Sequence, residues 1–201
     1  MASPTLLLAQ YLGLDAYGSE SAELALETLL RIRQIFPAKQ SCVIGGMAAV
    51  HYVGKTNRQI SPDLDLLISI GSAKLIERHF KTTANNFGVT VDCGEVSIHC
   101  LATMDAMERE VIETSHIANL AGSLVRVASM GGMMALKYMA GRAKDFDDIR
   151  LLLSVSISRP DHEQTLATAR KLIQRCHESQ AEDFESELLS ALLAHQHSAP
   201  P

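Results

Sequence analysis

Two glycines followed by two aspartates are the residues of this chain best placed to do chemistry. Gly45 and Gly46 follow the apolar run 42–44, and Asp63 and Asp65 open a second apolar run. Residues two positions apart in a strand point to the same side, so these carboxylates would repel unless a cation lay between them. Mg²⁺, or Mn²⁺ in its place, takes carboxylate and phosphate oxygens. Because a glycine turn opening a helix presents N–H groups to phosphate, the spacing predicts transfer of a phosphoryl or nucleotidyl group from a nucleoside triphosphate.

The elements that must position these residues are two strands and a short helix. Residues 41–44 are expected to form a strand, 47–53 a helix that ends at Gly54, and 63–70 a second strand. The second strand has one apolar face, with Leu64 and Leu66, and one face that carries Asp63 and Asp65. Such a strand suits a sheet whose second face forms a site.

The rest of the chain alternates helix and strand signals and then becomes helical. Further helices are expected over 20–36, from 72 to near Gly88, and over 105–114, and further strands over 89–92, 95–101 and 124–127. Four helices then follow, over 129–140, 145–154, 161–177 and 182–195. This order predicts an α+β fold with a small mixed β-sheet flanked by helices. Residues 1–18 would be a flexible or loosely docked arm, 19–128 the core, and 129–201 a helical C-terminal region packed on the core.

Composition narrows the class of protein. The 201 residues include 47% hydrophobic residues, which is enough for a core, and the net charge of −5 argues against a broad nucleic-acid-binding surface. The four cysteines show no metal-ligand or Cys-x-x-Cys spacing, which favours reduced, buried thiols. No stretch approaches the roughly 20 apolar residues that a membrane helix needs. We therefore expect a cytoplasmic protein with no membrane partner.

A second charged cluster lies in the C-terminal region. Lys137 stands on a helix otherwise rich in Met and Ala, one turn after Met133, so it lies near the buried stripe and either extends outward or reaches into a pocket. In a pocket, the Lys137 ammonium group would neutralise triphosphate charge. The charged residues that follow Lys137 allow two interpretations. They belong to the functional site, or they form surface ion pairs such as Lys144–Asp148 at i,i+4. These residues are Arg142, Lys144, Asp145 and Asp148.

The ordered set of residues resembles the nucleotidyltransferase superfamily that includes DNA polymerase β, and within it most closely the AbiEii-type toxin nucleotidyltransferases. The resemblance spans residues 40–153 and is carried by Gly45, Gly46, His51, Arg58, Ser61, Asp63, Asp65, Lys137, Arg142, Lys144, Asp145 and Asp148. It implies catalytic roles for Asp63, Asp65, Lys137, Asp145 and Asp148, and nucleotide contacts from Gly45, Gly46, Arg58, Ser61 and Arg142. It also implies a Mg²⁺-dependent transfer of a nucleoside monophosphate to an acceptor hydroxyl, with tRNA as a candidate acceptor and a cognate antitoxin as a candidate partner.

One expected element of that family is not evident in the sequence. Polymerase-β-like enzymes usually add a third carboxylate from a neighbouring strand, at a position that falls here in 96–101, where the chain offers His99. Asp92 and Glu95 are the alternatives. The missing carboxylate leaves open a catalytically degenerate domain that binds nucleotide or a partner. A second, enzymatic alternative is transfer to a small-molecule hydroxyl, as in antibiotic-modifying nucleotidyltransferases.

Overall fold

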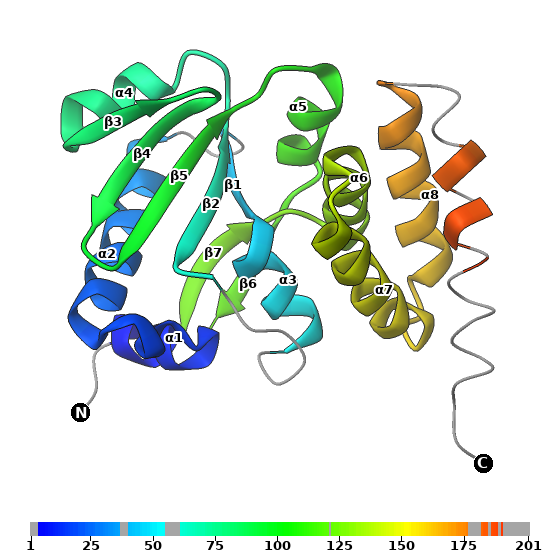
Figure 1. The fold of residues 1–201 in the computed structure, drawn as a ribbon, viewed down its shortest axis with the longest axis horizontal. Helices are drawn as coiled ribbons and strands as arrows, with labels where there is room; N and C mark the ends of the chain where they lie inside the picture. The colour runs from blue at the N-terminus through cyan, green and yellow to red at the C-terminus, as the bar shows by residue number, and fades with distance from the viewer. Residues whose placement is uncertain are drawn as a thin grey trace. The chain divides into compact units, whose positions relative to one another are not determined.

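The computed structural model describes residues 4–36, 40–54, 61–120, 122–176, 182–184, 186–188 and 190 (Figure 1). It divides into two units, Met1–Ser129 and Met130–Pro201. The first unit combines a mixed sheet with helices, and the described residues of the second are helical apart from short turns. The expected α+β fold with a helical C-terminal region is confirmed.

The first unit is built on a seven-stranded sheet in the order β3-β4-β5-β2-β1-β7-β6. The strands are β1 (Ser41–Ile44), β2 (Asp63–Ile68), β3 (Thr82–Asn85), β4 (Gly88–Cys93), β5 (Val96–Ala102), β6 (His116–Leu120) and β7 (Ser123–Val127). The central strand β2 runs antiparallel to β1 and parallel to β5. The strand that carries the two aspartates is therefore paired on both sides, which fixes their backbone.

Helices surround this sheet. They are α1 (Pro4–Leu12), the 3₁₀ helix η1 (Leu14–Tyr17), α2 (Ser19–Ile35), α3 (Gly45–Val53), α4 (Ala73–His79) and α5 (Ala106–Glu113). The helix α2 packs against β4 and β5 through a stripe at helical spacing, including Ala22, Leu26 and Leu29. In the sheet, Val96, Ile98 and Cys100 of β5 are buried, while the alternating residues Ser97 and His99 are half-buried. The β-strand alternation thus leaves one face of β5 accessible.

Residues 4–17 belong to the segment expected to be a flexible or loosely docked arm. They form α1 and η1, and α1 packs against α2. Leu8 and Leu14 are fully buried, and Leu12 is almost fully buried. The apolar residues that make this packing favourable recur about one helical turn apart.

Two strands differ from the sequence-based expectation. The helix that begins after Ser72 ends at His79 instead of continuing to Gly88, and Thr82–Asn85 forms β3. The β-branched Thr82 and Thr83 pair with β4. Asn85 then shapes the turn, because its Oδ1 accepts the Phe87 N–H at 2.9 Å and its Nδ2 donates to Thr90. The strand β6 was not expected and pairs antiparallel with β7.

The described part of the second unit contains α6 (Met130–Ala140), α7 (Ala143–Ile157) and α8 (His162–Gln174). The helices α6 and α8 approach closely at Gly131, where an added Cβ would lie 2.6 Å from the Thr165 carbonyl oxygen. Residues 182–184, 186–188 and 190 are also helical, and the remainder of the helix expected over 182–195 lies outside the described residues. None of the described helices in either unit is long and apolar enough to cross a membrane.

The cysteines fit the expectation of buried thiols for three of the four. Cys42, Cys93 and Cys100 are buried, Cys176 is partly exposed, and no disulfide joins any of them. Burial raises the pKa of the Cys42 thiol and of the Cys100 thiol to about 12. These two thiols are therefore protonated near neutral pH.

Candidate functional site

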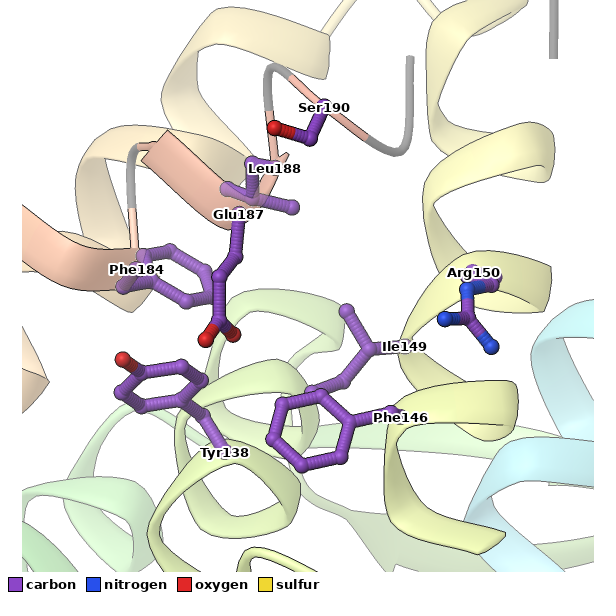
Figure 2. Close-up of a pocket in the computed structure, with 8 residues that line it drawn as sticks. All are labelled: Tyr138, Phe146, Ile149, Arg150, Phe184, Glu187, Leu188 and Ser190. Carbon is purple, nitrogen blue, oxygen red and sulfur yellow. The ribbon is translucent and has the colours of Figure 1, made fainter. Parts of the chain in front are cut away.

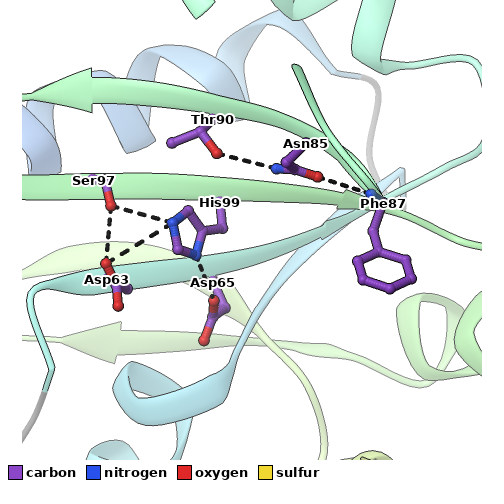
Figure 3. Close-up of polar contacts among 7 residues, drawn as sticks. All are labelled: Asp63, Asp65, Asn85, Phe87, Thr90, Ser97 and His99. Atoms are coloured by element: carbon purple, nitrogen blue, oxygen red, sulfur yellow. Dashed lines mark hydrogen bonds and ion pairs between the residues drawn. The ribbon is translucent and has the colours of Figure 1, made fainter. Parts of the chain in front are cut away.

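Asp63 and Asp65 lie on one face of the central strand β2, as the alternation predicts (Figure 3). In the parallel ladder with β5, Asp63 pairs with Ser97 and Asp65 with His99. Cross-strand partners project to the same side of a sheet. The two carboxylates therefore share their face with a hydroxyl and an imidazole, and 45% of the Asp63 side chain and 28% of the Asp65 side chain stay exposed.

Gly45 lies directly beside Asp65. The antiparallel ladder of β1 and β2 pairs Ile44 with Asp65, and Gly45 begins α3 immediately after β1. Gly45 has φ +64°, and a Cβ built on it would lie 2.0 Å from Asp65 Oδ2. Only glycine allows this turn and this approach. The first turn of α3, which has no side-chain cap, therefore starts next to a carboxylate of the site.

His99 lies between the two carboxylates. Its Nδ1 is 3.5 Å from Asp65 Oδ1, and its Nε2 is 3.9 Å from Asp63 Oδ1. The Ser97 hydroxyl donates to Asp63 Oδ1 at 3.0 Å and lies 3.3 Å from His99 Nε2 (Figure 3). These contacts link two aspartates, a serine and a histidine into one polar cluster on the open face of β2 and β5.

The strand register distinguishes the three alternatives for the third ligand position. His99 pairs directly with Asp65 and contacts both aspartates. Asp92 of β4 pairs with Ser97, one strand farther away, and its Oδ1 accepts the Gly94 N–H at 3.0 Å. Glu95 lies in the turn between β4 and β5, where its N–H donates to Ser21. The residue next to the aspartate pair is therefore an imidazole and not a carboxylate.

The remaining residues expected to contact nucleotide in this unit have different environments. Gly46 is buried in the first turn of α3, and Ser61 is exposed two residues before β2. Arg58 lies outside the described residues. His51 of α3 lies against the ring of Tyr52, with ring centroids 4.8 Å apart. The Tyr52 hydroxyl donates to the Ala128 carbonyl at 2.7 Å, which ties α3 to the end of β7.

The donor set of this cluster fits a magnesium site that is completed by substrate. Within the described part of the chain, no group of three or more His, Cys, Asp or Glu side chains is arranged to hold an ion. Mg²⁺ does not require such a group, because it is usually held by one or two carboxylates together with water and phosphate oxygens. Asp63 and Asp65 supply two such carboxylates, both accessible and beside the N-terminus of α3.

The charged residues expected to act from the second unit form a network of their own. Lys137 Nζ lies 2.8 Å from Asp145 Oδ1 and 2.6 Å from Asp148 Oδ2. Arg142 Nε lies 2.6 Å from Asp145 Oδ2, and its Nη2 lies 3.2 Å from Oδ1. Asp148 therefore pairs with Lys137 instead of with Lys144. Two positive and two negative groups meet in this network, which is neutral when all four are ionised.

Burial sets the energetics of this network. Asp145 is fully buried, Asp148 and Lys137 are nearly so, and Arg142 is exposed. Burial acts to raise the Asp145 pKa, but hydrogen bonds from Arg142 and Lys137 and their positive charges outweigh it, so the pKa lies below its ordinary value of 3.8. Because both carboxylates have charged partners inside the unit, the network has the character of a structural ion cluster joining α6 to α7.

Ser97 is the member of the polar cluster that sequence reasoning missed. Its residue type carries little information, because serine is common on strand surfaces. The signal was its spacing, since it precedes His99 by two residues on a strand and therefore shares its face. Its contact with Asp63 depends on the register between β2 and β5.

Comparison with known proteins gives likenesses of fold alone. No protein-family model matches the chain, and no curated protein matches it. Among solved structures, ANT(2'')-Ia in complex with adenylyl-2''-tobramycin is 17% identical with a TM-score of 0.52, covering 75% of this chain and 95% of that one. A solution structure of the antibiotic-resistance factor ANT(2'')-Ia is 16% identical with a TM-score of 0.51, covering 87% and 96%.

A third solved structure is an antigenic nucleotidyltransferase-like protein from Paracoccidioides brasiliensis. It is 16% identical to this chain, with a TM-score of 0.48, and the alignment covers 82% of this chain and 91% of that one. The likeness to the two ANT(2'')-Ia structures shows that the chain shares their fold.

Proposed function

We propose that this protein is a Mg²⁺-dependent nucleotidyltransferase that moves a nucleoside monophosphate from a nucleoside triphosphate to an acceptor hydroxyl. The observation that carries the proposal is the placement of Asp63 and Asp65 on one accessible sheet face, with Gly45 and the N-terminus of α3 against Asp65. The fold shared with ANT(2'')-Ia agrees with it.

Each part of the cluster has a role in this chemistry. The backbone N–H groups at the start of α3, opened by Gly45 and Gly46, would bind triphosphate oxygens. Asp63 and Asp65 would hold the metal ion, which neutralises phosphate charge and lowers the pKa of the attacking hydroxyl. The attacking oxygen would form a bond to the α-phosphorus while the bond to the pyrophosphate oxygen breaks. Ser97 would position Asp63 through its hydrogen bond.

The polar groups outside this cluster take a supporting place in the proposal. Ser61 and Arg58 precede Asp63 in the chain and are proposed to contact phosphate. Lys137, Asp145 and Asp148 are proposed to act with Arg142 mainly by holding α6 and α7 together, because the ammonium group of Lys137 already pairs with both carboxylates.

Two acceptor classes follow from different observations. The order of motifs resembling AbiEii-type toxins favours an RNA hydroxyl, with tRNA as candidate and a cognate antitoxin as partner. The fold likeness to a structure holding adenylyl-2''-tobramycin favours a small-molecule hydroxyl. We place the RNA acceptor first, since the residues that carry the AbiEii resemblance include the site itself.

The test is label transfer from each of the four common α-³²P-labelled nucleoside triphosphates. Wild type, Asp63→Asn, Asp65→Asn and a control, Glu77→Gln on the exposed side of α4, are incubated with Mg²⁺ and either total RNA or an aminoglycoside panel. The proposal expects labelled product with wild type and Glu77→Gln and a loss of at least about 100-fold in both aspartate variants. Transfer that persists in both aspartate variants would contradict it.

The non-enzymatic alternative has one specific observation in its favour. His99 stands where the family resemblance implies a third carboxylate, so one hard oxygen ligand is replaced by nitrogen. A degenerate domain would bind a non-hydrolysable nucleoside triphosphate in calorimetry, with an affinity that depends on Asp63 and Asp65, yet transfer no label to either acceptor class.

A further inference from the structure

The second unit contains a cavity of about 430 Å³ that the proposed chemistry does not use. Its volume lies within the roughly 300–1,000 Å³ typical of small-molecule sites. Figure 2 shows the residues that line it, which come from α6, α7 and the described helical residues beyond position 181: Tyr138, Phe146, Ile149, Arg150, Phe184, Glu187, Leu188 and Ser190.

Three aromatic rings form part of the cavity lining. The rings of Tyr138 and Phe184 meet edge to face with centroids 5.0 Å apart, and those of Tyr138 and Phe146 meet edge to face at 6.2 Å. Perpendicular rings of this kind present both faces and edges to a shared space. The faces carry the negative part of the ring quadrupole and attract cations.

Glu187 adds a negative charge to this aromatic cavity. Its side chain extends toward the Tyr138 ring in Figure 2. Burial, followed by the negative charges of Glu187 and Asp183, raises the pKa of the Tyr138 hydroxyl. Within the described part of the chain, Glu187 forms no ion pair. Glu187 and Asp183 therefore bring negative charge close to Tyr138, which favours a positive ligand.

Arg150 is the cationic residue of the lining, and its charge is already balanced. Its Nη1 lies 2.8 Å from Asp147 Oδ1, one helical turn earlier on α7. Ile149 and Leu188 are buried and supply apolar surface. The lining thus offers an apolar surface, aromatic faces and one carboxylate that forms no ion pair with the residues that the structure describes.

We propose that this cavity binds an organic ammonium ion, a primary or quaternary amine carried on a small apolar body. The apolar body would contact Ile149, Leu188 and the aromatic rings. The ammonium group would lie near Glu187 and over the faces of Tyr138 and Phe146. An anion would meet the Glu187 carboxylate, and a neutral apolar ligand would leave that carboxylate without a partner. The inference is independent of nucleotidyl transfer, because no residue of the Asp63–Asp65 cluster takes part in it.

The test compares three probes that share a phenyl ring and a two-carbon chain. They are 2-phenylethylammonium, the neutral 2-phenylethanol and the anion 3-phenylpropanoate, each titrated into the full-length ¹⁵N-labelled protein and followed by NMR. We expect saturable binding of the ammonium probe, with amide shifts at Tyr138, Phe146 and Leu188. Its Kd should be at least about tenfold lower than that of the alcohol, and the anion should bind most weakly.

Variants separate the carboxylate from the apolar surface. Glu187→Gln should raise the Kd of the ammonium probe by about tenfold and leave the Kd of the alcohol unchanged. The matched control Glu163→Gln removes the same charge from an exposed position of α8 and should change neither Kd. Phe146→Leu should weaken binding of the ammonium probe more than binding of the alcohol.

Several outcomes would overturn the proposal. Equal binding of the ammonium probe and the alcohol would reduce the cavity to an apolar one. Tightest binding of the anion, or saturable binding of none of the probes, would contradict it directly. These comparisons use wild-type protein, so they hold even where a variant fails to fold.

Discussion

Asp65 occupies the space that a side chain on Gly45 would need: a Cβ on Gly45 would lie 2.0 Å from Asp65 Oδ2, 2.8 Å from its Cγ and 2.9 Å from its Cβ. Rotation of the Asp65 side chain can move the oxygens, but it cannot move the Cβ. The contact therefore couples the turn after β1 to the carboxylate on β2. The same geometry that requires glycine brings the start of α3 to the candidate metal ligand.

Gly45→Ala should destabilise the first unit and abolish the proposed transfer. The substitution combines a left-handed backbone at φ +64° with the clash against Asp65, so we expect a loss of at least about 3 kcal/mol in unfolding free energy. Urea denaturation followed by circular dichroism measures it.

The matched control for Gly45 is Gly71→Ala. Gly71 has φ +84°, and nothing lies within 4 Å of a Cβ added there. The Gly71→Ala variant should lose only about 1 kcal/mol of unfolding free energy, from the backbone conformation alone. Equal losses in the two variants would mean that the contact with Asp65 has no energetic consequence.

His99→Asp should tighten Mg²⁺ binding at the aspartate pair. A third carboxylate opposite Asp65 adds a hard oxygen ligand, so we expect the Mg²⁺ affinity in calorimetry to rise at least about tenfold. Without metal, the added charge repels Asp63 and Asp65, and unfolding free energy in EDTA should fall by about 1 kcal/mol. His99→Asn removes the imidazole without adding charge. Identical Mg²⁺ affinities in the Asp and Asn variants would contradict the prediction.

Lys137→Met should strongly destabilise the second unit. The substitution leaves Asp145 and Asp148 buried without the ammonium group that pairs with both, and breaking a buried ion pair in this way costs about 3–5 kcal/mol. The urea-unfolding free energy monitored by fluorescence of the tyrosines reports the loss.

An exposed ion pair on α7 provides the comparison for Lys137. Arg150→Met breaks the ion pair with Asp147, in which the Arg150 side chain is 65% exposed and the Asp147 side chain 69%. The variant should lose no more than about 1 kcal/mol of unfolding free energy. A loss for Lys137→Met as small as that for Arg150→Met would show that the buried network adds nothing to stability.

The stability of the protein should depend on Asp145 at acid pH. Its pKa is lower in the folded state than the ordinary 3.8, because hydrogen bonds and charge from Arg142 and Lys137 outweigh the effect of burial. Its contribution is therefore fully present above the ordinary pKa and is lost as the pH falls below 3.8 toward the folded-state value. Unfolding free energies measured from about pH 6 down to about pH 3 should fall less steeply for Asp145→Asn than for wild type. If the unfolding free energies of wild type and Asp145→Asn fell equally steeply with pH, the role assigned to Asp145 would be contradicted.

Local patterns in the sequence predicted much of the fold. The strand at 41–44, the helix after it and the strand that carries Asp63 and Asp65 follow from apolar runs and glycine turns, and the structure has all three. The helix over 72–88 was wrong in its second half, because Thr82–Asn85 pairs with β4, and that pairing overrides a weak helical periodicity. The strand β6 has two exposed residues at its start and so gave little apolar signal.

The sequence by itself determined that Asp63 and Asp65 share one side of a strand, since the period of two is a property of each extended chain segment. It also determined that a glycine turn precedes them. Only the tertiary structure decided that His99 stands opposite Asp65, because register joins segments more than thirty residues apart. It likewise decided that Lys137 pairs with Asp145 and Asp148, because that contact depends on how α6 and α7 pack, which no local pattern encodes.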